Sequence, residues 1–325
     1  MTRLLLLGAG FSRNWGGWLG NEVFEYLLGC PEVIGDSYLQ TRLWHYKDQG
    51  GFEAALEELQ GEAIQGQVSS RLKKLEEAIH RMFSDMDAGF RNQPGNIFKF
   101  ELSPNDYLVR DFLYRFDTIF TLNQDLLLER HYYSRSDFGL SSVGRWMGYS
   151  LPGMRPESNP NAIDPHEDSL PNYVPSANFD VSPKQQPYYK LHGSSNWRDS
   201  NGRLIIALGG NKARTIQTHP VLKRSMDQFD SMLRMPDCRL MIIGYGFMDH
   251  HINQALQAAA NLGLKIFVID PLGVEAMRSP QERRPNQIRT DHPYKGSIIG
   301  ASRRALAQIF GSDRVEREKV LRFFA

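Results

Sequence analysis

Short apolar runs alternate along the chain with longer stretches in which apolar residues recur every three or four positions. The first run, Leu4–Leu7, has the continuous apolar character of a strand buried on both faces, and the turn Gly8-Ala9-Gly10 ends it. Comparable apolar runs predict strands over 117–122, 188–191, 203–208, 239–243 and 265–269. Strands that alternate with helices predict an α/β fold: a Rossmann-like, mostly parallel sheet with helices on both faces.

The helical periodicity divides the chain into a core, an insertion and a tail. Apolar spacing predicts helices over 18–28, 52–60, 71–86, 105–114, 126–132, 221–233 and 249–262. Residues 31–51 are interpreted as a turn-rich connector, and 31–115 as an all-helical insertion between two strands. The core then comprises 1–30 and 116–275, with an irregular excursion at 134–186 that suits a lid or an interaction surface. Residues 276–325 form a polar tail that ends in short helices near 302–310 and 314–324.

Composition narrows the class of protein. The 325 residues include 38 basic and 37 acidic side chains, so no excess of positive charge indicates direct nucleic-acid binding. Only two cysteines occur, far apart, which excludes a four-cysteine zinc site and a disulfide framework and suits a reducing cytosol. The run Leu4–Leu7 is too short to span a bilayer and lacks the features of a signal peptide. We therefore expect a soluble cytoplasmic protein with no membrane partner.

The first glycine turn is a candidate phosphate site. Gly8 and Gly10 have no Cβ, so their backbone can approach a ligand closely, and a helix that starts after them directs free N–H groups at a phosphate. The alternative is a glycine turn that binds nothing. The dehydrogenase fingerprint requires a third glycine, and Arg13 occupies that position, so hydride transfer is disfavoured.

Polar residues and glycines follow the carboxyl ends of several predicted strands. They are Asn123 and Asp125, His192, the Gly244-Tyr245 turn, and Asp270. In an open parallel sheet, ligands bind at the carboxyl ends of the strands. The sequence therefore predicts that these residues converge with the Gly8 turn on one site.

Motifs at these strand ends resemble those of the sirtuin family, in the same order. They are the turn Gly8–Ser12, the segment Thr121–Asp125, the pair His192-Gly193 and the turn Gly244–Phe247. The match is closer to a bacterial sirtuin-like branch, through the motifs at 190–197 (Lys-Leu-His-Gly-Ser-x-Asn-Trp) and 244–253 (Gly-Tyr-x-Phe-x-Asp-x-His-Ile-Asn). The resemblance covers 1–30, 116–132 and 187–272, and members of that branch consume NAD as effectors of anti-phage defence.

The resemblance implies an NAD hydrolase (NADase) rather than a deacetylase. Sirtuin deacetylases carry four zinc cysteines in two CxxC pairs, which this chain lacks, and Trp15–Leu19 replaces the Gly-Ile-Pro-x-Phe-Arg segment that follows their first motif. Both departures favour cleavage of the nicotinamide–ribose bond to give nicotinamide and ADP-ribose, with NAD as substrate and without zinc. The resemblance further implies a homo-oligomer that works with a separately encoded HerA-type ATPase.

The same resemblance assigns roles to individual residues. His192 would be the catalytic base, and Asn123 would position the attacking water and a ribose hydroxyl. The cofactor-binding set is Gly8, Ala9, Gly10, Phe11 and Ser12 for the phosphates, Asp125 for the nicotinamide side, and Gly244, Tyr245 and Asp270 for the adenosine half. These residue types suit the reaction, because nicotinamide departs as a neutral molecule and a histidine with a near-neutral pKa can accept the proton of water.

Simpler readings of these residues stay open at this point. His192 can be a structural histidine in a turn, and Asn123 with Asp125 can close an Asx turn. Other functions are a non-catalytic scaffold that binds NAD or ADP-ribose in a defence complex, or a protein ADP-ribosyltransferase. The pair His250-His251 resembles a metal-binding pair, but adjacent residues on a helix do not face one another, so surface or interface positions are expected for both.

Overall fold

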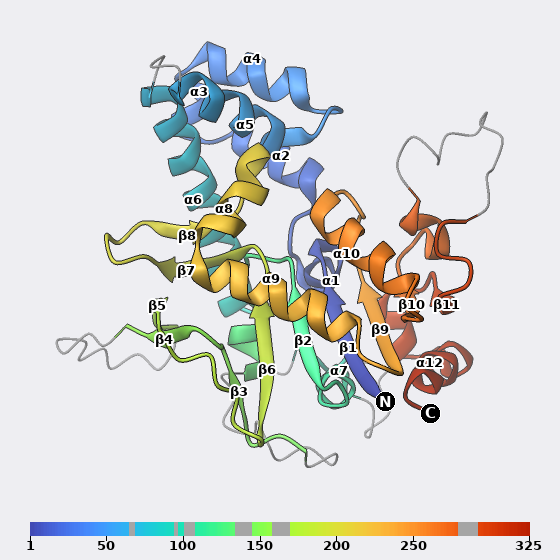
Figure 1. Ribbon diagram of the computed structural model, residues 1–325. Coiled ribbons are helices and arrows are strands. Elements are labelled where there is room, and N and C mark those ends of the chain that lie inside the picture. The colour runs from blue at the N-terminus through green and yellow to red at the C-terminus, as the bar shows by residue number, and fades with distance from the viewer. Residues whose placement is uncertain (65–68, 94–96, 101–107, 134–144, 158–169, 279–291) are drawn as a thin grey trace.

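A parallel sheet forms the centre of the molecule in this computed structural model, which describes residues 1–64, 69–93, 97–100, 108–133, 145–157, 170–278 and 292–325 (Figure 1). Seven parallel strands follow the order β11-β10-β9-β1-β2-β6-β3. Their bounds are β1 Thr2–Leu7, β2 Thr118–Thr121, β3 Gly148–Ser150, β6 Gln185–Lys190, β9 Cys238–Ile243, β10 Lys265–Ile269 and β11 Ile298–Ser302. A four-stranded sheet of order β4-β5-β7-β8 comprises β4 Met154–Pro156, β5 Tyr173–Pro175, β7 Gly193–Arg198 and β8 Leu204–Ile206.

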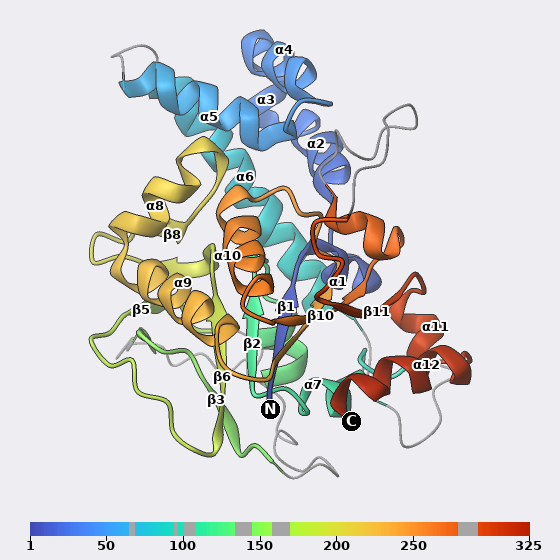
Figure 2. The ribbon, with the colours of Figure 1, turned by 45° about the vertical axis from the view of Figure 1, so that its right-hand side comes forward.

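The leucines of β1 explain why the sheet is covered on both sides. Successive side chains of a strand point to opposite faces, so a continuous apolar run buries both faces. Leu4 and Leu6 belong to the hydrophobic cluster that includes α9 and α10, whereas Leu5 and Leu7 belong to the cluster that includes α7, α11 and α12. Figures 1 and 2 show these helices on the two sides of the sheet. The Rossmann-like, parallel α/β prediction is confirmed.

The helices follow the predicted periodicity in most places. Those before and within the insertion are α1 Ala9–Ser12, η1 Arg13–Trp15, α2 Gly20–Leu28, α3 Pro31–Ile34, α4 Ser37–Tyr46, α5 Gly51–Ile64, α6 Ser69–Arg91 and α7 Val109–Leu113. The later ones are η2 Glu129–Tyr133, η3 Gly209–Asn211, α8 Lys212–Thr218, α9 Pro220–Leu233, α10 His250–Ala260, η4 Gly273–Met277, α11 Leu306–Phe310, α12 Arg314–Leu321 and η5 Arg322–Phe324. Within the described ranges, no helix is both long and apolar enough to cross a membrane.

The helices α2–α6 lie beyond the carboxyl ends of the strands (Figure 1). The long helix α6 buries one apolar stripe, which includes Leu75, Ile79 and Met82. These side chains belong to the same hydrophobic cluster as Leu5 and Leu7 of β1. The helices α2–α6 therefore share a continuous hydrophobic core with one face of the sheet. This core fixes them over the carboxyl ends of the strands, where a site is expected.

Three predictions about secondary structure need correction. The expected connector at 31–51 contains α3 and α4, and the Asp36 carboxylate accepts a hydrogen bond from Leu39 N at the start of α4. The excursion at 134–186 contains β3, β4, β5 and the start of β6 among its described residues. In the tail, β11 pairs in parallel with β10, and the helix expected at 302–310 begins only at Leu306. Short, Gly-containing β11 has little sequence signal and depends on pairing with its neighbour.

Parts of the predicted elements lie outside the described residues. They are 105–107 of one expected helix, 134–144 and 158–169 of the excursion, and 279–291 of the tail.

Candidate functional site

Two glycine turns meet where β1 and β9 end. Gly8 N donates a hydrogen bond to Ile243 O at 3.0 Å, and Gly10 N donates to Gly244 O at 2.9 Å. Gly244 has φ +63°, and a Cβ there would lie 2.4 Å from the Gly10 carbonyl carbon and from Phe11 N. These glycines therefore have a structural function, because they allow the two strand ends to approach each other closely. Chain order reverses between β1 and β9, the point where open α/β sheets bind ligands.

The first predicted group is the asparagine cluster, formed by Ser12, Asn123 and Asp125. Asn123 Nδ2 donates hydrogen bonds to Gly8 O at 3.1 Å and to Ser12 Oγ at 3.0 Å. Ser12 Oγ in turn donates to Asp125 Oδ2 at 2.8 Å. Asp125 Oδ1 accepts from Leu127 N at 3.1 Å, which is the Asx-turn contact considered from the sequence. The structure thus joins residues more than 100 positions apart into one buried network.

A buried ion pair between Lys190 and Glu129 contacts the backbone of Asp125. Lys190, at the end of β6, has no exposed surface, and its Nζ donates to Asp125 O at 2.6 Å and to Glu129 Oε1 at 2.7 Å. Burial raises the pKa of the Asp125 carboxyl group, while the charge of Lys190 acts in the opposite direction. Burial likewise raises the pKa of Glu129. No role was predicted for this pair, although Lys190 begins the motif at 190–197, two residues before His192.

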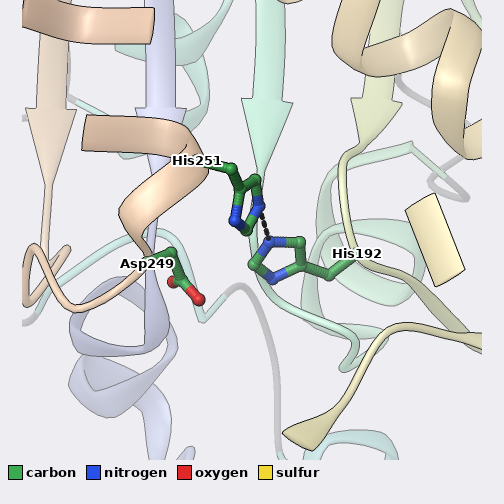
Figure 3. Close-up of side chains that lie close together, drawn as sticks. All are labelled: His192, Asp249 and His251. Atoms are coloured by element: carbon green, nitrogen blue, oxygen red, sulfur yellow. Dashed lines mark hydrogen bonds between the residues drawn. The ribbon is translucent and has the colours of Figure 1, made fainter. Parts of the chain in front are cut away.

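The second group is the histidine cluster, formed by His192, Asp249 and His251 (Figure 3). His192 follows β6 and is 2% exposed, and its Nε2 lies 3.0 Å from Nε2 of His251 on α10. Asp249 occupies the N-cap position of α10, as expected, but its side chain makes no capping hydrogen bond. Its carboxylate instead accepts from Lys212 Nζ at 2.8 Å. His250 is exposed and His251 is partly exposed, and the His251 ring faces His192, a contact that was not predicted from the sequence.

Burial favours the neutral form of both imidazoles. Burial lowers the pKa of His192 to about 3, and the nearby Asp249 carboxylate offsets this only in part. Burial lowers the pKa of His251 as well. For Asp249, burial acts to raise the pKa, but the interactions of the carboxylate with His192 and with the Lys212 ammonium group outweigh it, so the pKa is lowered. A neutral imidazole has a lone pair that can accept a proton or bind a metal ion.

Lys212 connects the histidine cluster to the helical insertion. Its ammonium group lies 2.6 Å from Glu53 Oε2 on α5 and 2.8 Å from Asp249 Oδ1. Burial acts to lower the pKa of Lys212, but these two carboxylates outweigh it and raise the pKa. Neither Lys212 nor Glu53 was identified from the sequence, because nothing in their local pattern distinguishes them from surface charges.

The two clusters follow neighbouring strands at one edge of the sheet. Leu191 N donates to Thr121 O at 2.9 Å, and Ser195 N donates to Gln124 O at 3.0 Å, so the segments after β2 and β6 run side by side. Asn123 and His192 belong to these two segments. The backbone segments after β2 and β6 therefore lie together, and the side chains form two separate hydrogen-bonded groups. Convergence of all the predicted residues on one ligand stays a prediction.

The other predicted residues contribute mainly through their backbone or have structural partners. Phe11 is buried, with its ring centroid 5.0 Å from that of Trp15, whereas Ala9 is exposed. The Tyr245 hydroxyl donates to Asn253 Oδ1 at 3.0 Å and accepts from Asp249 N at 3.1 Å, so it stabilises the start of α10. Asp270 follows β10, and its Oδ1 accepts from Leu272 N at 2.8 Å.

A family model and several solved structures are similar to this chain. No curated protein matches the sequence. A solved mutant of a Sir2 homologue in complex with ADP-ribose is 14% identical, with a TM-score of 0.40, and the match covers 99% of this chain and 93% of that one. A Sir2 homologue in complex with NAD is also 14% identical, with a TM-score of 0.38 and coverages of 99% and 90%. The SIR2-like domain model matches residues 117–288, more than half of the sequence. The chain therefore belongs to the family of proteins with a SIR2-like domain.

Proposed function

We propose that the protein is an NAD hydrolase that cleaves the nicotinamide–ribose bond and releases nicotinamide and ADP-ribose. The observation that carries the proposal is the juxtaposition of the asparagine cluster and His192 after neighbouring strands, at the edge where the glycine turns of β1 and β9 meet. Membership in the SIR2-like family supports NAD as the substrate.

In this proposal the bond between nicotinamide and C1′ of the ribose breaks, and its electron pair leaves with nicotinamide, which becomes neutral. The oxygen of water then bonds to C1′, and the water proton passes to His192, directly or through a ribose hydroxyl. Asn123 positions the water and the hydroxyl through its Oδ1, which accepts their hydrogen bonds, because its Nδ2 already donates to Gly8 O and to Ser12 Oγ. The turn Gly8–Phe11 and Ser12 lie against the diphosphate through groups other than Gly8 N and Gly10 N, which donate to Ile243 O and Gly244 O. Asp125 faces the nicotinamide side, and Gly244, Tyr245 and Asp270 contact the adenosine half.

The low pKa of His192 fits the resting state of such a base. An imidazole must be neutral before it accepts a proton, and burial keeps His192 neutral at pH 7. A base with a pKa of about 3 is weak, so the negative diphosphate of the bound substrate has to raise the pKa during turnover. This part of the proposal predicts that free ADP-ribose raises the His192 pKa, which NMR titration of the imidazole signals measures.

The test follows nicotinamide and ADP-ribose after purified protein is mixed with NAD. Release of both, lost in Asn123→Ala and in His192→Ala while the unfolding temperature is retained, supports hydrolysis. The matched control is His250→Ala, because His250 is exposed and next to the histidine cluster in sequence. Binding without nicotinamide release points instead to a scaffold, and nicotinamide release with labelled protein but no free ADP-ribose points to protein ADP-ribosylation.

The biological setting is part of the proposal. An NAD hydrolase of this branch would act in the cytoplasm as an anti-phage effector, without zinc, as a homo-oligomer and together with a HerA-type ATPase. Bacteria that express the chain, with and without a neighbouring ATPase gene, are infected with phage while cellular NAD is measured. Protection with NAD loss, absent in Asn123→Ala, is the expected result, and protection without NAD loss contradicts it.

A further inference from the structure

Two residues of the histidine cluster have no role in the proposed hydrolysis. His192 is one member, but His251 and Asp249 have no part in the reaction described above. We propose that His192, His251 and Asp249 bind a divalent transition-metal ion such as Zn²⁺, and that the bound ion prevents His192 from acting as a base. The metal site is independent of the proposed function, whereas its inhibitory effect depends on that function.

The distances between the three side chains are close to those of a metal site. One ligand atom from each residue lies within 4.8 Å of the others, and the two Nε2 atoms are 3.0 Å apart. With Zn–N bonds of about 2.0 to 2.1 Å in a tetrahedral site, two imidazole nitrogens on one ion lie roughly 3.3 Å apart. The two histidines are therefore already spaced for one ion, and the carboxylate has to move by up to about 1.5 Å to join them.

The directions of the side chains also converge. Figure 3 shows one ring nitrogen of His192 facing one ring nitrogen of His251, with the Asp249 carboxylate pointing toward the two rings. The ring planes are inclined by 49°, with centroids 5.1 Å apart, so the imidazoles meet at an angle and do not stack. His192 is buried, while Asp249 and His251 are partly exposed, which leaves a route for an ion from solvent.

The surrounding charges favour a cation. Among the described side chains that form ion pairs here, the carboxylates of Asp249 and Glu53 outnumber the single ammonium group of Lys212. A dication next to this group therefore meets a net negative environment even though Lys212 is close. Lys212 also holds Asp249 in place, as hydrogen-bonded neighbours of metal ligands commonly do.

The ligand types indicate which ions fit. Two imidazoles and one carboxylate match zinc and other transition metals, whereas Mg²⁺ and Ca²⁺ favour oxygen ligands. Three protein ligands leave a fourth position for water. Because the ion takes the lone pair of His192, that nitrogen can no longer accept a proton.

The first experiment measures binding without any reference to activity. Tag-free protein is treated with a chelator, the chelator is removed, and the protein is titrated with Zn²⁺ by calorimetry and with Co²⁺ by visible absorption. One ion per chain with a tetrahedral Co²⁺ spectrum is expected, and removing one ligand by His251→Ala should weaken binding by more than about 100-fold. His250→Ala is the matched control and should bind like the wild type.

Two results would overturn the metal site. One is the lack of saturable binding by the folded wild-type protein, and the other is equal affinity in wild type and His251→Ala. Asp249→Asn preserves the shape of the third ligand and gives a second reading should His251→Ala fail to fold. In that variant, Co²⁺ affinity falls and the absorption spectrum changes if Asp249 is a ligand, and both remain unchanged if it is not.

A second experiment tests inhibition. Nicotinamide release is compared in wild-type protein with a chelator and with saturating Zn²⁺, and at least about tenfold slower release with Zn²⁺ is expected. In His251→Ala the ratio of the two rates should approach one at the same Zn²⁺ concentration. Equal rates in Zn²⁺-loaded and metal-free wild type overturn the inhibitory effect. No release in either state counts against the proposed hydrolysis, and the binding experiment then decides the metal site alone.

Discussion

The asparagine cluster and the histidine cluster lie at the same edge of one sheet, yet they are held in very different ways. The asparagine cluster rests on the contact between two glycine turns and on the buried Lys190–Glu129 pair. The histidine cluster depends on one nitrogen–nitrogen contact and on an ion pair with Lys212, whose partners are partly exposed. We therefore expect the asparagine cluster to be held rigidly by the core, and the histidine cluster to adjust more readily to a ligand or to the helical insertion.

The largest effect is expected where the glycine turns touch. In Gly244→Ala, the added methyl group would lie 2.4 Å from backbone atoms of Gly10 and Phe11 in a left-handed backbone conformation. The turns must then separate, which should lower the free energy of unfolding by more than about 4 kcal/mol. Denaturant unfolding measures the loss. Gly89→Ala is the control, since nothing lies within 4 Å of its Cβ in α6, and it should gain about 0.5 to 1 kcal/mol.

The next largest loss of stability is expected when the Lys190–Glu129 pair beside Asp125 is broken. Lys190→Met leaves Glu129 as a buried charge without its cation, so the free energy of unfolding should fall by about 3 kcal/mol. The double variant Lys190→Met with Glu129→Gln removes the isolated charge and should recover more than a third of this loss. Lys265→Met, at an exposed lysine of β10, should change stability by less than about 0.5 kcal/mol. Equal losses at the two lysines would contradict the structural difference between them.

The pH dependence of stability reports on the histidine cluster, because His192 is buried as a neutral imidazole. The pKa of His192 is lowered to about 3 in the folded chain, so the unfolded chain binds a proton first as the pH falls below about 6.5. Stability should therefore decrease from pH 7 to pH 5, with His192 contributing about 2 kcal/mol of the change. Denaturant unfolding of wild type and His192→Gln, both with a chelator, measures this contribution as the difference between their pH profiles. Parallel profiles would mean that His192 is not buried as a neutral group.

The smallest effect is expected at the link to the insertion. Lys212→Met removes the ion pairs to Glu53 and Asp249, which are partly exposed, and should cost about 1 kcal/mol of unfolding free energy. Lys223→Met removes an exposed pair on α9 and should cost less than about 0.5 kcal/mol. Thermal unfolding compares the two variants. A loss at Lys212 as large as that at Lys190 would show that the histidine cluster is as rigid as the asparagine cluster.

Much of the fold could be predicted because its elements carry strong local patterns. The leucines of β1, the apolar runs of β9 and β10 and the stripe of α6 each fix an element and the face that it buries. Weak patterns failed where neighbours decide the structure, as in β11, which pairs with β10 despite its glycine and its short length. The helix α4 was missed although Leu39 and Leu43 are four residues apart and both are buried.

The parallel sheet, the glycine turns and the polar residues at the strand ends could be predicted from the sequence, because each depends on neighbouring positions along the chain. Which side chains meet depends on how the elements pack: Ser12 with Asn123, Lys190 with Glu129, and His192 with His251. His251 shows the physical reason most directly. Its adjacency to His250 on a helix gave no reason to expect a partner, and only the placement of α10 brings its ring to His192.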